Sequence, residues 1–240
     1  MPAASARPCR VLIVHAHPEP HSFCAALRDA AVSELRAAGC QVEVSDLYAR
    51  GFNPVAAADD FRVRRDPDYL VYALEQRHAV EQHTLLPEIQ AEIDKVLACD
   101  LLILSFPVFW FSMPAMLKGW IDRVFVSGLF YGGRRIYGQG GMRGKRALVC
   151  ATLGGREHMF GTGALHGDLI QMFRPLLQGS LAYVGMEVLT PFFGYHVPYL
   201  DDAGRAAILA AWRQALRERD QRASLAMPDL ERFDREFRPL

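Results

Sequence analysis

The sequence predicts an α/β fold, a doubly wound, five-stranded parallel sheet in the order 2-1-3-4-5 with helices on both faces. Three observations predict it. Short apolar segments typical of buried parallel strands alternate with amphipathic helical segments along the chain. The chain has 240 residues, enough for one large domain. It is 51% hydrophobic and 22% charged, as globular proteins are.

The expected elements alternate along the chain. The strands are Val11–Val14, Gln41–Val44, Leu101–Ser105, Arg146–Ala151 and Glu187–Pro191. Apolar residues at helical spacing predict the helices Phe23–Ala38, Leu86–Cys99, Pro114–Val126, Ala164–Val184 and Asp201–Ser224. Ser22 is expected to cap the first helix, and Pro175 should kink or break the fourth. The charged segment 48–83 is expected to be a long irregular connection.

Composition limits the partners. Lys plus Arg and Asp plus Glu both number 27, and this zero net charge argues against nucleic-acid binding. The sequence lacks a run of 18 apolar residues, so membrane insertion is not expected. Residues 2–9 are expected to form a disordered lead without signal-peptide features. Five widely spaced cysteines, without a C-x-x-C pair, predict reduced thiols and a cytoplasmic location.

A doubly wound sheet binds its ligand at the carboxyl ends of its strands. The loop His15–Phe23 leads from the first strand into a helix, whose free N–H groups can bind a phosphate. Ser22 adds a hydroxyl there and His17 a further donor. Two alternatives stay open for this loop: an ordinary proline-rich turn, and metal binding by His15, His17 and His21.

Two further loops end neighbouring strands. Phe106–Pro114 carries an aromatic cluster between two prolines, which suits a flat heteroaromatic ring, with core packing as the alternative. Ala151–Gly155 ends in two glycines. Glycines let a backbone approach a ligand closely, and the N–H groups can stabilise negative charge.

These loops resemble those of the NAD(P)H:quinone oxidoreductases of the DT-diaphorase type. The resemblance runs from about Arg10 to about Arg219. Its motifs are His17-Pro18 with Ser22-Phe23, Pro107-x-x-Trp110-Phe111-x-x-Pro114-Ala115-x-Leu117-Lys118-Gly119-Trp120, Thr152-x-Gly154-Gly155 and His166-Gly167-Asp168.

The resemblance implies a flavodoxin-like homodimer that binds FAD, with FMN as the less favoured flavin. It implies hydride transfer from NAD(P)H to a small-molecule quinone by a ping-pong mechanism, at a site between the subunits. The implied cofactor-binding residues are His17, Ser22, Phe23 and Cys24 around the pyrophosphate, Val108, Phe109, Trp110, Phe111, Thr152, Leu153, Gly154, Gly155 and Phe160 around the ring system, and Arg205 near the adenine half.

The resemblance also implies the catalytic and substrate-binding residues. His166, with the N–H groups of Gly154 and Gly155, would stabilise negative charge on the flavin, although His166 also reads as an ordinary helix-start histidine. The implied substrate-binding residues are Phe130, Tyr131 and Gly132 of the other subunit, with Tyr183 and His166.

The sequence departs from the family pattern at three positions. Cys24 stands where the family often has asparagine, and Gly133 where it has a second lid tyrosine. Phe160 stands at a tyrosine position, so a tyrosine–histidine proton relay through it is excluded. These departures bear on substrate range and nicotinamide preference.

The resemblance divides the chain into a quinone reductase domain, residues 10–224, and a tail, 225–240, expected to cross the dimer partner. Two other functions stay open. One is a regulatory partner of a potassium-efflux transporter, and the long 48–83 connection speaks against it. The other is an azo- or nitro-reductase that uses the same flavin chemistry.

Overall fold

The computed structural model describes residues 9–240, and it confirms the predicted fold class. The sheet runs in the order β2-β1-β3-β4-β5, all parallel, with β6 also pairing with β4. Its strands are β1 (Arg10–His15), β2 (Gln41–Asp46), β3 (Leu101–Pro107), β4 (Arg146–Thr152), β5 (Glu187–Val188) and β6 (Phe192–Gly194).

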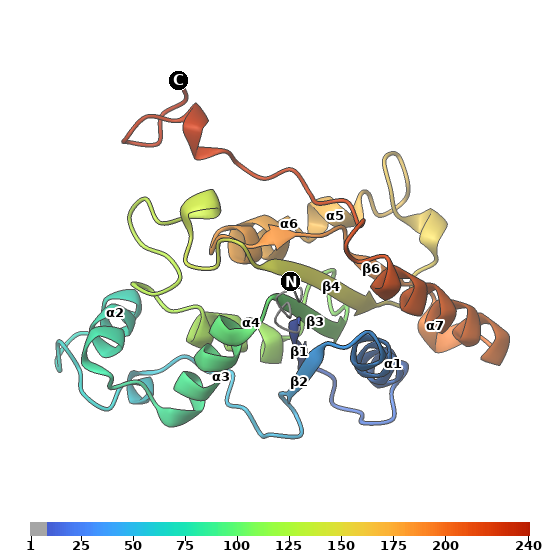
Figure 1. The fold of residues 1–240 in the computed structure, drawn as a ribbon, viewed down its shortest axis with the longest axis horizontal. Helices are drawn as coiled ribbons and strands as arrows, with labels where there is room; N and C mark the ends of the chain where they lie inside the picture. The colour runs from blue at the N-terminus through green and yellow to red at the C-terminus, as the bar shows by residue number, and fades with distance from the viewer. Residues whose placement is uncertain (1–8) are drawn as a thin grey trace, which may run out of the picture.

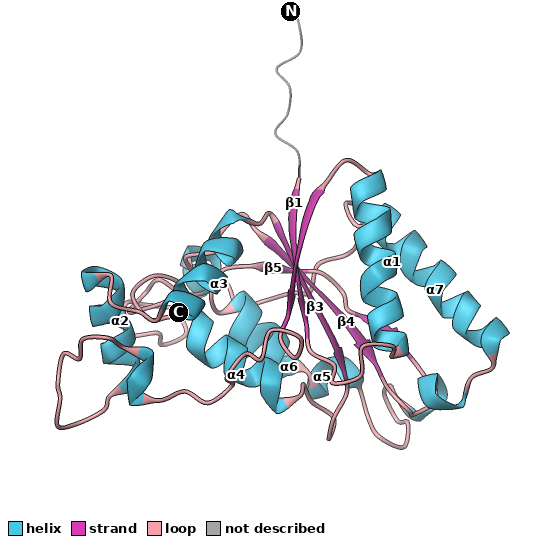
Figure 2. Cartoon of the chain, turned by 90° about the horizontal axis from the view of Figure 1, so that it is seen from below, coloured by secondary structure: helices cyan, strands magenta, loops and turns pink. Residues whose placement is uncertain are grey.

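Helices cover both faces of the sheet (Figures 1 and 2). On one face lie α1 (Phe23–Ala37) and α7 (Asp202–Arg217). On the other lie α2 (Tyr72–Gln82), α3 (Pro87–Ala98), α4 (Ala115–Val124), α5 (Leu169–Met172) and α6 (Arg174–Leu176). Shorter helical turns are η1 (Ala58–Asp60), η2 (Tyr137–Gln139), η3 (Glu157–Met159), η5 (Val197–Tyr199) and η6 (Leu230–Arg232), and η4 (Leu177–Ala182) is a π-helix.

Each face of the sheet has its own apolar core. Ile13, Leu27 and Trp212 lie in the core beneath α1 and α7. Leu104 and Trp120 lie in the larger core on the opposite face. Strands buried on both faces explain why β1 and β3 read as continuous apolar segments rather than alternating ones.

The expected helix Ala164–Val184 is only partly confirmed. Residues 164–168 form turns, with Gly167 at φ +79°, and helix α5 begins only after Asp168. The Asp168 carboxylate caps it by accepting the N–H of Gln171 at 3.0 Å. As expected, the helix breaks next to Pro175, which cannot donate a backbone hydrogen bond.

The fifth strand and the last helix also differ from expectation. The segment 187–191 pairs with β4 only at Glu187–Val188, and the strand position resumes as β6 after Pro191. Pro191 has no N–H to donate to a ladder. Helix α7 ends at Arg217 instead of Ser224, because the chain then turns back and Ala223 accepts the N–H of Thr190.

The connection 48–83 was expected to be irregular, but it contains helix α2. This helix buries Glu75 and Gln76, so its buried face is not apolar and gives no periodic signal. Glu75 accepts the N–H groups of Arg65 and Asp66, and the Gln76 side chain donates to the carbonyl of Asp122 at 2.9 Å.

A buried arginine and a glycine fix this connection to α4. Arg123 is almost fully buried and forms ion pairs with Asp60 and Glu88, each at 2.7 Å. A Cβ at Gly119 would lie 1.9 Å from the carbonyl oxygen of Pro54. The Lys118-Gly119-Trp120 motif is therefore a packing signature, because only glycine lets the connection approach α4 this closely.

Two expectations concern the ends of the chain and membranes. The lead expected at 2–9 lies outside the described residues except for Cys9. Within residues 9–240, none of the helices is both long and apolar enough to span a bilayer.

Candidate functional site

The carboxyl ends of β1, β3 and β4 bring the three predicted loops to one edge of the sheet. Strand pairing joins them directly, since the N–H of Val108 donates to the carbonyl of Thr152 at 2.7 Å. On the other side, the N–H of Ala16 donates to the carbonyl of Ser105 at 2.9 Å. The three loops therefore form one continuous surface.

The aromatic loop is a tight hairpin with an unusual backbone. Phe109 and Ser112 exchange two backbone hydrogen bonds, both of 2.9 Å. Between them, Trp110 and Phe111 adopt φ values of +50° and +57°. Two successive positive φ angles define a type I′ turn, which normally takes Asn and Gly. Bulky aromatics there are strained, and such strain is concentrated at functional sites.

The exposure of this turn is also unusual. The Trp110 side chain is 97% exposed, so it contributes nothing to packing in this chain. Core packing, the alternative interpretation of the loop, therefore does not account for it. An exposed indole on a strained turn indicates a surface that a ligand or a second chain covers.

The two glycines of the third loop have different surroundings. A Cβ at Gly155 would lie 2.7 Å from the Phe160 ring, whereas one at Gly154 would have 3.7 Å to its nearest neighbour, Tyr199. Both glycine carbonyls accept hydrogen bonds from His196: its backbone N–H donates to Gly155 at 2.9 Å, and Nδ1 of its ring donates to Gly154 at 3.1 Å.

His196 was missed by sequence reasoning. It has a left-handed backbone, φ +58°, in the loop after β6, and no motif marks it. Its neighbour Tyr195 was also missed, although the Tyr195 ring lies 5.9 Å from Phe160. A histidine and a tyrosine just past the last strand are the only sequence signal, because parallel strands end at the ligand-binding edge.

His166 lies between two aromatic rings of this edge. Its ring centroid is 5.3 Å from that of Phe111 and 5.2 Å from that of Phe160. Its backbone N–H donates to the carbonyl of Met159 at 2.9 Å. The half-buried imidazole is thus brought to the aromatic loop.

The loop between β1 and α1 has its expected cap. The Ser22 hydroxyl accepts the N–H of Ala25 at 3.1 Å, and Phe23 and Cys24 begin helix α1. The Nδ1 atom of His17 accepts the N–H of Glu19 at 3.0 Å, which leaves Nε2 as the nitrogen that carries a proton. Burial lowers the pKa of His17, so the ring is neutral at pH 7.

The metal-binding alternative gains no support. Among residues 9–240, His, Cys, Asp and Glu side chains form no cluster of three that suits a metal ion. His15 points into the core instead of toward the loop surface, where His21 is exposed.

Beneath the loop lies a small buried polar cluster. Nδ1 of His15 and the hydroxyl of Ser105 share a hydrogen bond at 3.0 Å, and Cys24 Sγ lies 3.7 Å from the same hydroxyl. Burial, followed by the charge of Arg28, lowers the pKa of His15 to about 4. Burial raises the pKa of Cys24 to about 11, so this thiol is a packed, unreactive group.

Of the predicted substrate-binding residues, His166 lies at this edge, whereas Tyr131 and Tyr183 lie elsewhere in the chain. Tyr131 packs against Tyr183 at 5.7 Å beside a cavity of about 360 Å³. In Figure 1 the segment 127–145 lies at the left and the loop 154–168 at the right. Phe130 is fully buried and packs on Phe125 at 5.7 Å, so the structure puts it in the core rather than on a substrate-facing surface.

Arg205 lies in the first turn of α7, which follows β6 and therefore begins at the ligand-binding edge. It is partly exposed and forms a weak ion pair with Asp202 at 3.6 Å. A loosely held cation at that edge is available to a ligand.

Comparison with known proteins identifies the family of the chain. The chain matches the family described as flavodoxin-like fold over residues 9–218. It is 39% identical over 208 residues to the ribosyldihydronicotinamide dehydrogenase (quinone) of Pongo abelii, covering 86% of this chain and 90% of that protein. The chain belongs to the family of flavodoxin-like quinone dehydrogenases.

Two further family members support the assignment. The chain is 38% identical to NAD(P)H dehydrogenase (quinone) 1 of Cavia porcellus, over 86% of this chain and 76% of that protein. A solved structure from Klebsiella pneumoniae superposes with a TM-score of 0.87 at 34% identity, covering 96% of this chain and 90% of the other.

The residues at the carboxyl edge of the sheet fit a flavin. A Cβ at Gly155 would lie 2.7 Å from the Phe160 ring, and Phe111, which follows the exposed Trp110 in the strained turn, lies 6.4 Å from the same ring. The N-terminus of α1 with Ser22 offers N–H donors to a phosphate. Flat aromatic surface and phosphate donors therefore occur together at one edge.

Proposed function

We propose that the chain is an FAD-dependent NAD(P)H:quinone oxidoreductase that transfers hydride in two half-reactions at one site. The observation that carries the proposal is the strained Trp110–Phe111 turn, which follows β3 as Gly154 and Gly155 follow the paired strand β4. The names of the curated relatives support a quinone as acceptor. A flavin supplies the hydride-accepting and hydride-donating chemistry at this edge.

In this proposal the protein binds and orients. The α1 N-terminus with His17, Ser22, Phe23 and Cys24 holds the pyrophosphate, while Arg205 binds nearer the adenine half. The loops Val108–Phe111 and Thr152–Gly155, with Phe160, hold the ring system. The N–H groups of Gly154 and Gly155 and the His166 imidazole stabilise negative charge. Because Phe160 has no hydroxyl, it takes no part in proton transfer.

We infer that the working unit is a homodimer. The segment 127–145, which carries Tyr131 and Gly132, lies on the opposite side of the view from the loop 154–168 (Figure 1), so these residues, with Tyr183 packed on Tyr131, would complete the partner's site. The 97% exposed Trp110 also needs covering. Sedimentation at micromolar concentration should therefore give a dimer, and an active monomer would contradict this arrangement.

We also propose a cytoplasmic location. All five cysteines, Cys9 among them, are free thiols in the structure. Free thiols persist where the compartment is reducing.

The first experiment identifies the cofactor. The purified protein should be yellow and release about one FAD per chain on heating, which mass spectrometry distinguishes from FMN. FMN alone would overturn the FAD assignment, and a colourless protein that takes up neither flavin would overturn the whole proposal.

The second experiment tests the reaction. Initial rates with NADH, NADPH or ribosyldihydronicotinamide as donor and a quinone as acceptor should give parallel double-reciprocal lines. Intersecting lines would contradict a shared site. Faster turnover of azo or nitro acceptors than of any quinone would assign the alternative activity.

A further inference from the structure

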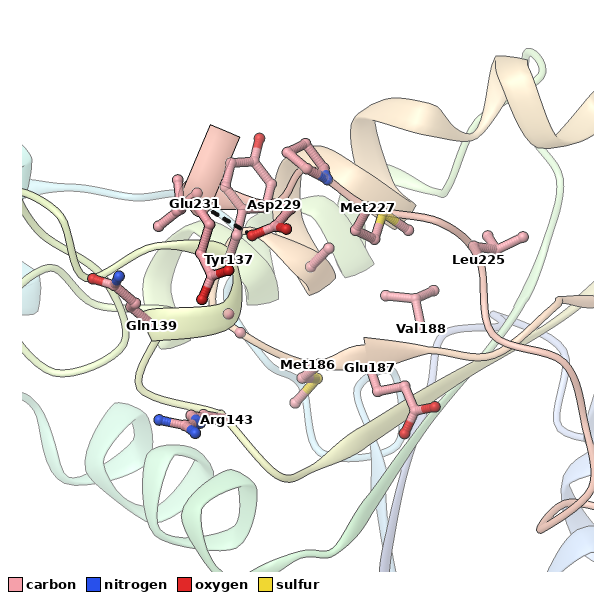
Figure 3. A pocket seen from close by; sticks show the side chains of 15 residues that line it. Tyr137, Gln139, Arg143, Met186, Glu187, Val188, Leu225, Met227, Asp229 and Glu231 are labelled. Carbon is pink, nitrogen blue, oxygen red and sulfur yellow. Dashed lines mark hydrogen bonds between the residues drawn. The ribbon is translucent and has the colours of Figure 1, made fainter. Parts of the chain in front are cut away.

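The C-terminal tail crosses the protein as a strap held at its two ends. Near its start, the N–H of Leu225 donates to the carbonyl of Val188 at 2.8 Å. Its middle then spans a cavity of about 560 Å³, which Tyr137, Met186, Met227 and Glu231 line among others (Figure 3). Leu230 is buried in this middle part, and the turn over residues 233–239 forms the far end of the strap.

The far end is a compact, preformed turn. Asp234 organises it: one carboxylate oxygen accepts the N–H groups of Glu236 and Arg238, at 2.8 and 2.9 Å. Phe233 and Pro239 pair as an antiparallel bridge. Within the turn, Phe237 has a φ of +63°, strained for an aromatic residue. Such a turn is built to present Phe237 in one direction.

Arg134 is the residue that meets this turn. Its Nη1 donates to the carbonyl oxygen of Asp234 at 2.6 Å. Its guanidinium carbon lies 5.1 Å from the centroid of the Phe237 ring, within the range of a cation–π interaction. Arg134 is half-buried, so water screens these two contacts less than it would at an open surface.

Arg134 also belongs to the turn that carries Tyr131. Gly132 and Arg135 exchange backbone hydrogen bonds at 3.3 and 3.0 Å around Gly133 and Arg134. The carbonyl of Tyr131 accepts the N–H of Gly128 at 2.8 Å. Gly132 and Gly133 both have positive φ, and two successive glycines leave this turn few packing contacts of its own.

We propose that Arg134 is a positioning residue, which ties the C-terminal tail to the Tyr131 turn and so fixes the Tyr131 ring over the quinone. The inference rests on the proposed function, in which Tyr131 covers the substrate of the partner subunit. Arg134 itself contacts neither substrate nor cofactor. The tail, through Phe237 and Asp234, thereby adjusts how large a quinone the site accepts.

The test measures the turn directly and then its effect on substrate. In Arg134→Ala and Phe237→Ala, amide hydrogen exchange of the segment 127–137 should become about threefold to tenfold faster. The KM for a two-ring naphthoquinone should rise about threefold to tenfold, while kcat and the KM for benzoquinone change less than about twofold. Arg134→Lys should recover part of the effect, because lysine keeps the charge but not the planar donor group.

Arg238→Ala is the matched control. It removes an arginine from the same tail turn, yet this side chain is exposed and pairs only with Glu236 among the residues described. It should leave both measurements unchanged.

Each contrary outcome is distinct. Unchanged exchange in Arg134→Ala would overturn the tie between tail and turn. Faster exchange with an unchanged KM would overturn the positioning role but leave the proposed function intact. A wild-type protein that reduces no quinone would overturn the proposed function together with the role of Tyr131, while the exchange data would still decide whether Arg134 holds the turn.

Discussion

Gly155 and Phe160 are in such close contact that the ring occupies the space of any side chain at position 155. A Cβ there would lie 2.7 Å from Cε2 of Phe160. The second glycine of the Gly-Gly pair is therefore a packing requirement, and it keeps the backbone of this loop flat against an aromatic ring.

Gly155→Ala is expected to displace Phe160 and lower the unfolding free energy by about 1–3 kcal/mol, the usual range for overpacking. Flavin affinity should fall with it, as measured by titration of the apoprotein. Gly154→Ala is the matched control, since its Cβ has 3.7 Å of space, and it should be near neutral in stability. Gly155→Ala combined with Phe160→Leu should recover stability if the clash is the cause.

Trp110→Gly is expected to separate folding from ligand binding. The indole is exposed and its φ of +50° suits glycine, so the unfolding free energy of the apoprotein should change by less than about 1 kcal/mol. Flavin affinity or dimer affinity should fall at least about tenfold, equivalent to about 1.4 kcal/mol. A large loss of apoprotein stability, measured by urea unfolding, would mean that the indole has a packing role.

His166→Ala is expected to slow flavin reduction by the donor about tenfold without abolishing it, a change of about 1.4 kcal/mol. The N–H groups of Gly154 and Gly155 remain to stabilise the charge. The loss of rate should therefore be smaller than if His166 were the only hydrogen-bond donor to the flavin. Anaerobic stopped-flow absorbance measures this step. His158→Ala, an exposed histidine in the same loop, is the control. A wild-type rate in His166→Ala with flavin fully bound would remove the imidazole from the mechanism.

The stability of the protein should fall with acid because of His15. Burial, followed by the charge of Arg28, lowers its pKa from 6.5 to about 4 in the folded chain, so between these values the unfolded chain binds more protons. Stability is then full above about pH 6.5 and declines toward pH 4, by about 3 kcal/mol at most.

Urea unfolding at pH 7.5 and 5 tests this linkage. In His15→Phe the difference in unfolding free energy between the two pH values should shrink by about 2 kcal/mol, leaving the contribution of His17, whose pKa is also lowered by burial. The exposed His158→Gln should keep the wild-type difference. An undiminished difference in His15→Phe would contradict the assignment.

Periodicity and local residue chemistry predicted most of the sheet. The strands beginning near Val11, Leu101 and Arg146 are apolar segments in sequence and strands in the structure, because burial on both faces leaves a clear local signal, and the edge strand beginning at Gln41 shows the alternation of a half-exposed strand. The Ser22 cap was also predicted, because capping involves only residues three apart and so leaves a local signal in the sequence. Helix α2 was not, because its buried face carries the polar Glu75 and Gln76, and Gln76 is held by Asp122, which lies far along the chain.

The sequence by itself determined the parallel sheet, the three loops at its carboxyl edge and the family resemblance they carry. Only the tertiary structure decided which of those residues meet. It brought His166 between Phe111 and Phe160, put Phe130 in the core, and joined the tail to the Tyr131 turn through Arg134. The physical reason is the separation along the sequence of the residues that interact. Strands and caps depend on neighbours a few residues away, whereas the contacts of His166 with Phe111 and of Arg134 with the tail join segments tens of residues apart, whose approach depends on the packing of the whole fold.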